Sequence, residues 1–465
     1  MKKRRRQIIP LAAKQTKSTG ENDLSKSQRR IADVSDTRTA SDLHTHSGPV
    51  FDVMKLYEDF KSKEQTRPED ESIDDVIGTS LSRSLAHSKR FVASPPQAHN
   101  WIAFDLGDDD IALPRFSGTE SVAQLVHPSI NDRGMRTWKI WKGPKTVVHG
   151  LMLPKILGSC EDAPPLCFAP VLGGKDITFL GVFDGMGGAG AQGTDFEIRN
   201  IRVKSSQAML ASRLARLTLE KEIVQDSIRS AAALKERIRE RLDRAESFIR
   251  MRSNSRIRGT LTKRLPTTLV FTQVKQTVNR SRITTWWAGD SRAFLVTPTE
   301  GLTALTADHV ESPDQLEQLR TDPPVKNVVN QSTDFFLEES TIDIDEPYVV
   351  LLATDGVFGY LPTPGILELG LLESLSAGAN LFANRFGHFC AKFAADDLSA
   401  TVLVNGFNDD KDVAFQFRDR LRVLRNQYKL ILGMTTEDEN WKLEVERLWA
   451  IERPIYQRLS RLHHG

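Results

Sequence analysis

The sequence predicts an α+β protein in which antiparallel sheets are covered by helices, and two observations lead to this fold class. Short apolar runs rich in β-branched residues, such as ITFLGVF (177–183) and YVVLLAT (348–354), are bounded by glycine or acidic residues, as buried strands are. Three further runs between residues 267 and 296 are separated only by short polar turns. Such close spacing indicates an antiparallel meander, because parallel strands need long crossovers.

The remaining elements are predicted from their periodicity. Early strands are expected at residues 145–153 and 167–171. Apolar residues then recur at helical spacing, so that a long helical region is expected over 203–252 and another over 365–393. A last strand is expected over 399–407, which leaves strands and helices in comparable amounts.

Beyond Asn408 the pattern is purely helical. Gly433 occupies a C-cap position, and a second helix is expected from Thr436, with Glu439 completing a capping box and Pro454 interrupting the helix. A helical hairpin packed on the main domain is the favoured interpretation. A pair of helices that binds a partner or dimerises is the alternative.

Composition excludes several classes of protein. The chain of 465 residues is 39% hydrophobic and 27% charged, and its formal net charge of +2 argues against a globally basic nucleic-acid binder. Its three cysteines form no C-x-x-C motif, so neither a disulfide framework nor a thiolate zinc site is indicated. Since no apolar stretch is long enough for a signal-peptide core or a membrane span, we expect a soluble, cytoplasmic protein.

Shifts in composition divide the chain into four regions. The first is polar and is expected to be disordered, and its KKRRR cluster weakly suggests contact with nucleic acid or a membrane. Aromatic residues return in the second, an extension of unknown role that we expect to be ordered. The regions are 1–95 (disordered, basic and polar), 96–144 (ordered extension), 145–407 (main domain) and 408–465 (C-terminal helical extension).

Acidic residues stand where the predicted buried strands begin or end. Asp184 follows ITFLGVF, Asp355 follows YVVLLAT, and Asp396 shortly precedes LSATVLV. A buried carboxylate is costly alone, but carboxylates that meet at one sheet edge can share a hard cation such as Mg²⁺ or Mn²⁺. Glycine follows the acid at Gly185 and Gly356, where the absence of a Cβ permits close approach. The pattern predicts a divalent metal site.

A dinucleotide-binding motif competes for the same loop, because GMGGAG (185–190) satisfies G-x-G-x-x-G. That fold needs a second strand ending in an acid about 20 residues further on, where the ribose would bind. Here the corresponding segment is helical in pattern, and its first acid is Glu220. The later meander also contradicts a parallel sheet, so the metal interpretation is preferred.

Taken in order, the motifs resemble those of a known family. FLGVFDGMGG, TTLVFTQV, WAGDSRAFLV, LTADHV, VVLLATDGVFGYL and DDLSATVLV are similar to the successive motifs of the PPM family, the metal-dependent (type 2C) serine/threonine protein phosphatases. The pair in CEDA (160–163) resembles the Glu-Asp pair of the family's first strands. The resemblance covers roughly residues 145–407 and implies a four-layer αββα sandwich with a phosphatase domain.

The resemblance also implies roles for individual residues around two Mn²⁺ or Mg²⁺ ions. Asp184 would bridge both ions, the carbonyl of Gly185 would bind one of them, and Asp355 and Asp396 would bind the other. Seven residues then make up the predicted site: Glu161, Asp162, Asp184, Gly185, Asp290, Asp355 and Asp396. Within this set, Glu161 and Asp162 would hold waters on the ions, and Asp290 would help to bind a third ion.

The function implied by the resemblance is hydrolysis of phosphoserine or phosphothreonine in a phosphorylated protein substrate. This chain departs from the family at three places. Met186 stands where many members have a histidine, Leu157 and Gly158 stand where an arginine usually grips phosphate, and the usual flap sequence before Asp355 is hard to find. A catalytically weak or inactive module that binds phosphoproteins or scaffolds a complex is therefore the alternative. A weaker idea is an interaction platform formed by the basic tail and the C-terminal helices.

Overall fold

The computed structural model describes residues 129–459 with gaps. The omitted positions within this span are 132–133, 144, 157–159, 170, 173–174, 191–192, 199–200, 226, 229, 249, 252–262, 278, 312–322 and 435–437. The predictions for 1–95 and for most of 96–144 thus lie outside the described residues. In the part of the chain that is described, no helix has both the length and the apolar character needed to cross a bilayer.

The first of two large sheets is antiparallel and has seven strands in the order β1-β2-β3-β16-β15-β12-β13. Its strands are β1 (Ser129–Ile130), β2 (Arg136–Gly143), β3 (Thr146–Leu153), β12 (Arg292–Thr297), β13 (Gly301–Ala304), β15 (Tyr348–Ala353) and β16 (Leu398–Asn405). The strands β1 and β2 precede residue 145, so the described end of the 96–144 region is built into this sheet.

A second sheet, also antiparallel, has the order β14-β11-β10-β6-β4, with β5 paired to β6. Its strands are β4 (Ala163–Phe168), β5 (Val171–Leu172), β6 (Lys175–Phe183), β10 (Leu269–Gln276), β11 (Ser281–Ala288) and β14 (Glu338–Ile344). The meander expected between residues 267 and 296 is divided between the two sheets, since β10 and β11 lie in the second sheet and β12 in the first.

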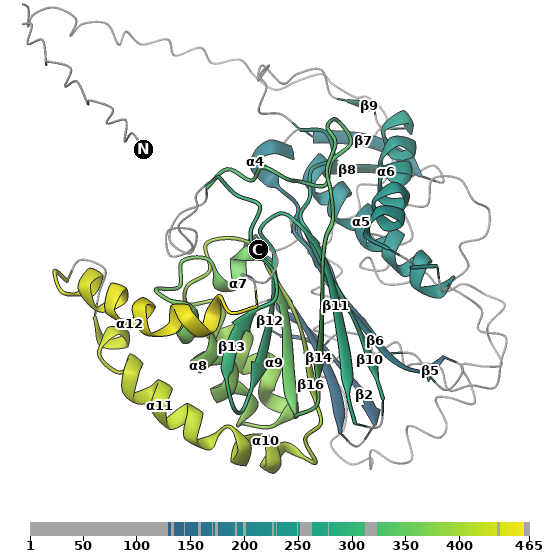
Figure 1. The fold of residues 1–465 in the computed structure, drawn as a ribbon. Coiled ribbons are helices and arrows are strands. Elements are labelled where there is room, and N and C mark those ends of the chain that lie inside the picture. The colour runs from purple at the N-terminus through teal and green to yellow at the C-terminus, as the bar shows by residue number, and fades with distance from the viewer. Residues whose placement is uncertain are drawn as a thin grey trace, which may run out of the picture. The chain divides into compact units, whose positions relative to one another are not determined.

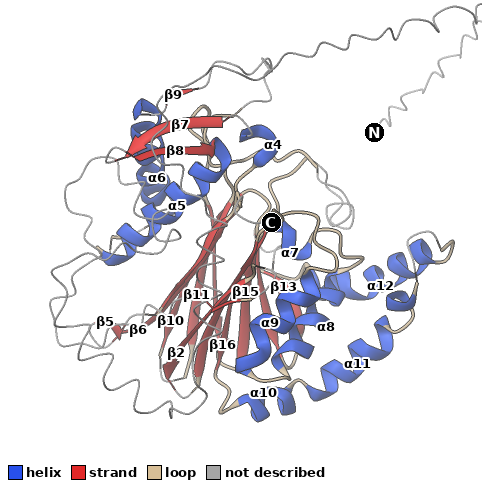
Figure 2. Ribbon diagram, turned by 180° about the vertical axis from the view of Figure 1, so that it is seen from behind, coloured by secondary structure: helices blue, strands red, loops and turns tan. Residues whose placement is uncertain are grey.

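Helices cover the outer face of each sheet, which gives four layers (Figures 1 and 2). The helices α5 (Gln207–Val224) and α6 (Ala231–Phe248) pack on the second sheet, and α8 (Pro364–Leu375) and α9 (Ala379–Cys390) pack on the first. A third apolar cluster, which includes Val148 of β3 and Leu180 of β6, fills the space between the sheets. The α+β fold and its αββα layering are confirmed.

The structure corrects the expected helices in two places. Residues 203–206 belong to a small sheet of β8 (Ile201–Ser206), β7 (Gly193–Ile198) and β9 (Arg250–Met251), and α5 and α6 replace one long helix. The region 365–393 is helical as expected and consists of α8 and α9. At the C-terminus, α12 (Trp441–Tyr456) begins after Thr436 and continues past Pro454. The glycine motif leads into the four-residue helix α4 (Gly187–Gly190), not into a dinucleotide-binding βαβ unit.

The C-terminal helices are part of the core on the side of the first sheet. This group comprises α10 (Asp410–Gln416), α11 (Arg418–Tyr428), the short 3₁₀ helix η2 (Ile431–Gly433) and α12, the outermost helices of that side in Figures 1 and 2. Leu421, Leu424 and Leu448 are buried in the same cluster as the residues of α8. Arg420 of α11 binds the buried carboxylate of Glu368 through two hydrogen bonds of 2.7 and 2.6 Å. The helices are thus packed on the main domain, as favoured from the sequence.

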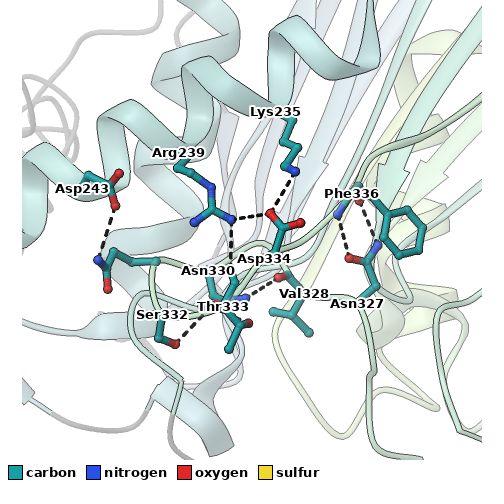
Figure 3. Close-up of polar contacts among 11 residues, drawn as sticks. Lys235, Arg239, Asp243, Asn327, Val328, Asn330, Ser332, Thr333, Asp334 and Phe336 are labelled. Carbon is teal, nitrogen blue, oxygen red and sulfur yellow. Dashed lines mark hydrogen bonds and ion pairs between the residues drawn. The ribbon is translucent and has the colours of Figure 1, made fainter.

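On the side of the second sheet, the loop before β14 is attached to α6 (Figure 3). Asp334 forms ion pairs with Lys235 at 2.9 Å and with Arg239 at 3.0 Å. The side chain of Asn327 bridges the loop, because it donates to the carbonyl of Phe336 at 2.9 Å and accepts from its amide at 3.0 Å. These contacts fix the loop on the helical layer.

We expect Glu452 to make stability depend on pH. Burial raises its pKa to about 7 from an ordinary value of 4.5, although it accepts hydrogen bonds from Tyr428, Thr363 and the amide of Gly365. Its contribution is complete below pH 4.5 and is lost as the pH rises through 7, which amounts to roughly 3 kcal/mol. Urea unfolding at pH 5 and 7.5 should show this loss in the wild type and not in Glu452→Gln. An equal pH dependence in both proteins would contradict the prediction.

Candidate metal centre

Both large sheets deliver aspartates to the same end of the sandwich. Asp184 follows β6 and Asp290 follows β11, both in the second sheet, while Asp355 follows β15 of the first sheet and begins α7 (Asp355–Phe358). Asp162 lies in the loop that leads into β4 and is only 2% exposed. The two sheets therefore bring together acids that are up to 193 residues apart, from Asp162 to Asp355.

These four aspartates interact with one another. The pKa of Asp184 is raised well above its usual value by burial first and then by the charges of Asp355, Asp162 and Asp290, and a hydrogen bond to the Asp355 side chain raises it further. Burial and Asp355 likewise raise the pKa of Asp290. The pKa of Asp162 is raised by burial, by Asp397 and by Asp355. Negative charge therefore accumulates at this end of the sandwich, where Asp162 is buried and Asp184, Asp290 and Asp355 are partly buried.

The backbone of the two Asp-Gly steps is closely packed, as expected. A Cβ on Gly356 would fall 1.9 Å from the carbonyl oxygen of Asp397, and a Cβ on Gly185 would fall 2.4 Å from that of Glu161. Any larger residue would push these segments apart. The carbonyl of Asp184 is held by the amide of Thr268 at 2.9 Å, which connects the site to the start of β10.

Glu161 lies beside the turn that follows Asp184. Its Oε1 accepts a hydrogen bond of 2.5 Å from Ser206, the residue that also caps the N-terminus of α5. A Cβ on Gly187 would fall 1.9 Å from Oε2, so the carboxylate rests against this glycine. Burial raises the pKa of Glu161, and the charges of Asp397 and Asp396 raise it further, against the opposing effect of Ser206. Glu161 is therefore held at the same end of the sandwich as the four aspartates.

The acidic doublet before β16 is divided between two environments. Asp396, the predicted ligand, has a side chain that is 61% exposed and lies 3.9 Å from Lys155 Nζ. Asp397 is buried and accepts hydrogen bonds of 2.7 Å from the amides of both Lys155 and Glu161. Sequence reasoning missed Asp397, and its only signal was the doublet itself. Asp396 lies close enough to Glu161 for its charge to raise the pKa of that residue. A metal-binding role for Asp396 is still a prediction.

The donor set fits a hard divalent cation. Carboxylate oxygens are the ligands that Mg²⁺ and Mn²⁺ prefer, and a divalent cation offsets the repulsion of buried like charges. Within the described residues, no group of three or more His, Cys, Asp or Glu side chains is placed so that it could hold a metal ion. The site nevertheless matches a divalent cation in the chemistry of its ligands, in its burial and in its charge. The coordination of Asp184, Gly185, Asp290, Asp355, Asp396, Glu161 and Asp162 is still a prediction.

Positive charge at this end comes from residues other than the usual phosphate-gripping arginine. Positions 157 and 158, where it would stand, lie outside the described residues. Lys155 is 56% exposed beside Asp396. The buried Arg213 of α5 donates to the carbonyl of Cys160 at 3.0 Å and so supports the loop that carries Glu161. Lys155 is thus an exposed cation beside Asp396, whereas Arg213 is a buried, structural one.

Comparison with known proteins identifies similar folds only. No family model and no curated protein match the chain. Among solved structures it resembles PppA of Pseudomonas aeruginosa (19% identity, TM-score 0.37, 56% of this chain and 98% of that one) and the serine/threonine phosphatase Stp1 of Staphylococcus aureus (14%, 0.38, 56% and 94%). It also resembles the catalytic domain of the phosphatase PstP with two manganese ions (17%, 0.36, 56% and 98%). Stp1 and PstP are named as serine/threonine phosphatases, and PppA is named as a regulatory component of a T6SS. Such low identities and TM-scores do not assign an activity.

The two members of the acidic doublet should differ in their effect on stability. Asp397→Ala leaves two backbone amides without their carboxylate acceptor, so we expect a loss of about 2 kcal/mol after partial relief of charge repulsion. Asp396→Ala removes an exposed side chain and should cost less than about 1 kcal/mol. Urea unfolding in EDTA measures both. Equal losses would show that Asp397 does not hold this loop.

Proposed function

We propose that this protein is a metal-dependent phosphatase that hydrolyses phosphoserine or phosphothreonine in proteins, in the cytoplasm. The observation that supports the proposal most is the mutual electrostatic influence of Asp162, Asp184, Asp290 and Asp355, supplied by both sheets, in one partly buried acidic centre. The order of motifs around these acids, which resembles that of the PPM phosphatases, supports the same reaction. Two Mn²⁺ or Mg²⁺ ions, with a third at Asp290, are the proposed cofactors.

The chemistry requires concentrated positive charge, because phosphate monoesters hydrolyse extremely slowly without a catalyst. When bound, a pair of divalent cations lowers the pKa of a water and neutralises the phosphoryl oxygens. The protein's own part is to hold the carboxylates in place. Asp184 is fixed through its backbone carbonyl, Asp162 through a 3.0 Å hydrogen bond from Thr354, and Glu161 through Ser206.

Substrate would approach from the exposed side of the doublet. Lys155 and Asp396 are both exposed on this side, and the ammonium group of Lys155 would bind phosphate as a point charge. A lysine holds phosphate with less geometric definition than the bidentate fork of an arginine. We therefore propose that contacts with the phosphate group discriminate little between phosphoproteins. Other surfaces of the protein would then recognise the substrate. A partner bound by the outer faces of the C-terminal helices belongs to this proposal, as does contact of the basic N-terminus with nucleic acid or a membrane.

We expect the purified protein to hydrolyse p-nitrophenyl phosphate in the presence of Mn²⁺ and to lose this activity in EDTA. Phosphoserine and phosphothreonine peptides should be dephosphorylated under the same conditions, with release of inorganic phosphate. Uptake of Mn²⁺ or phosphopeptide without release of phosphate would instead support the alternative of an inactive phosphoprotein-binding module. Turnover that survives EDTA would contradict a metal mechanism.

Substitution of a central aspartate should remove both metal binding and activity. Asp184→Asn and Asp355→Asn keep the shape of the side chain, and we expect each to lower kcat/KM roughly 100-fold or more, since even outer groups around metal ligands cost 10- to 100-fold. At 100 times its Kd, Mn²⁺ should stabilise the wild type by about 2.7 kcal/mol and these variants much less. Thermal unfolding with and without Mn²⁺ measures this second effect.

Asp419→Asn is the matched control for this substitution, because Asp419 is an exposed aspartate on α11 with a side chain that is 67% exposed. It should retain both the activity and the stabilisation by Mn²⁺. If Asp184→Asn and Asp419→Asn respond equally to Mn²⁺, the acidic centre is not the metal site.

A further inference from the structure

We propose that Tyr456, at the end of the C-terminal helix α12, is a positioning residue for the acidic centre. The inference rests on the proposed function, and it assigns to the C-terminal extension a part in the site. Tyr456 acts through Arg292, whose Nη1 donates a hydrogen bond of 3.1 Å to the tyrosine hydroxyl. The two residues are separated by 164 positions in the chain.

Arg292 is a buried cation with a nearly complete set of contacts. It is 3% exposed, and its Nε and Nη2 donate to Asp308 at 2.8 and 2.5 Å. Its guanidinium lies 4.3 Å from the ring centroid of Phe358. A buried guanidinium must have its donors satisfied, and its rigid fork transmits the position of one acceptor to the others. The hydroxyl of Tyr456 therefore helps to decide where this group lies.

Two of the site aspartates depend on the position of Arg292. Asp290 stands two residues before Arg292, in the turn between β11 and β12, and the charge of Arg292 acts on it. Phe358, which packs under the guanidinium, ends the single-turn helix α7 that begins at Asp355. Arg292 is thus close in sequence to Asp290 of the second sheet, and it contacts the helix that begins with Asp355, after the first sheet.

Tyr456 is itself held firmly. It is 4% exposed, and its ring contacts Trp449 of α12 in an edge-on arrangement at 5.7 Å and Phe294 of β12 at 6.4 Å. One turn earlier, Glu452 accepts a hydrogen bond of 2.7 Å from the amide of Gly365, at the N-terminus of α8. Because α8 follows α7 in the chain and β12 pairs with β15, which precedes Asp355, α12 contacts an element on each side of the segment that carries Asp355. This attachment makes it a rigid support for the hydroxyl.

The test is Tyr456→Phe in the full-length protein, which keeps the ring and removes only the oxygen. We expect kcat for p-nitrophenyl phosphate to fall about tenfold, at the lower end for groups that orient metal-binding residues, with KM changed less than about twofold. The Mn²⁺ concentration for half-maximal activity should rise by a similar factor. Hydrogen exchange of residues 355–358 should become faster.

Tyr428→Phe is the matched control, because it also removes a tyrosine hydroxyl from the C-terminal helices, here one that donates to Glu452. The hydrogen bonds of Glu452 with Thr363 and with the amide of Gly365, which attach α12 to α8, stay in place, as does the contact of Tyr456 with Arg292. It should lower the Tm but leave kcat and the Mn²⁺ dependence unchanged. A purely structural role for Tyr456 would lower the Tm with wild-type kcat and Mn²⁺ dependence, and this result would overturn the proposal.

Failure of the proposed function would be recognised separately. If the wild type shows no EDTA-sensitive turnover, the phosphatase assignment fails, and the exchange rate of residues 355–358 then decides the positioning role. Faster exchange in Tyr456→Phe than in Tyr428→Phe would support it. Equal exchange in the two variants would refute it.

Discussion

The main constraint on this structure is the mutual repulsion of carboxylates at one end of the sandwich, which the rest of the fold must hold together. Burial raises the pKa values of Asp162, Asp184 and Asp290, and the charge of Asp355 raises them further. The pKa of Asp184 is also raised by the charges of Asp162 and Asp290. Such a cluster costs free energy in the absence of a cation, so that the surrounding fold must hold it against separation. The three apolar clusters, one between the sheets and one under each helical layer, supply that constraint.

The loop between β3 and β4 shows how locally the constraint is applied. Asp397 accepts from the amides of Lys155 and Glu161, at the two ends of the segment that introduces Glu161 and Asp162. The hydrogen bonds connect the first sheet, through the residue just before β16, to the entrance of β4 in the second sheet. Because Asp397 is itself acidic, it also raises the pKa of Asp162. The same carboxylate therefore holds the loop in place and adds to the repulsion within it.

The sequence could predict those parts of the fold and site that have a local signal. The strands that precede Asp184 and Asp355 follow from apolar, β-branched runs, and their Asp-Gly steps mark closely packed backbone. The division of the doublet had no such signal, because neighbouring aspartates differ only in which of them faces the interior. The β7–β8 hairpin was hidden as well, since Val203 lies seven residues before Leu210 and so continues the apolar spacing of α5. The contact of Tyr456 with Arg292 depends on tertiary packing across 164 residues, which no local pattern encodes.

The boundary that the sequence places at residue 408, between the main domain and the C-terminal helical extension, does not separate two cores in the structure. The change to a purely helical pattern marks a boundary there in the sequence, but Leu421, Leu424 and Leu448 are each at most 5% exposed and share a core with α8 and the first sheet. Burial of a leucine side chain contributes about 1.5–3 kcal/mol, so these contacts are comparable to the whole stability of an ordinary domain. Glu368, which is 1% exposed, also has its bidentate partner, Arg420, in this extension. Without Arg420, Glu368 would remain as a buried charge next to α11, a situation more costly than exposing an apolar side chain. The extension is therefore required by the main domain, and its closeness to Asp355 and Asp290 follows from the same packing.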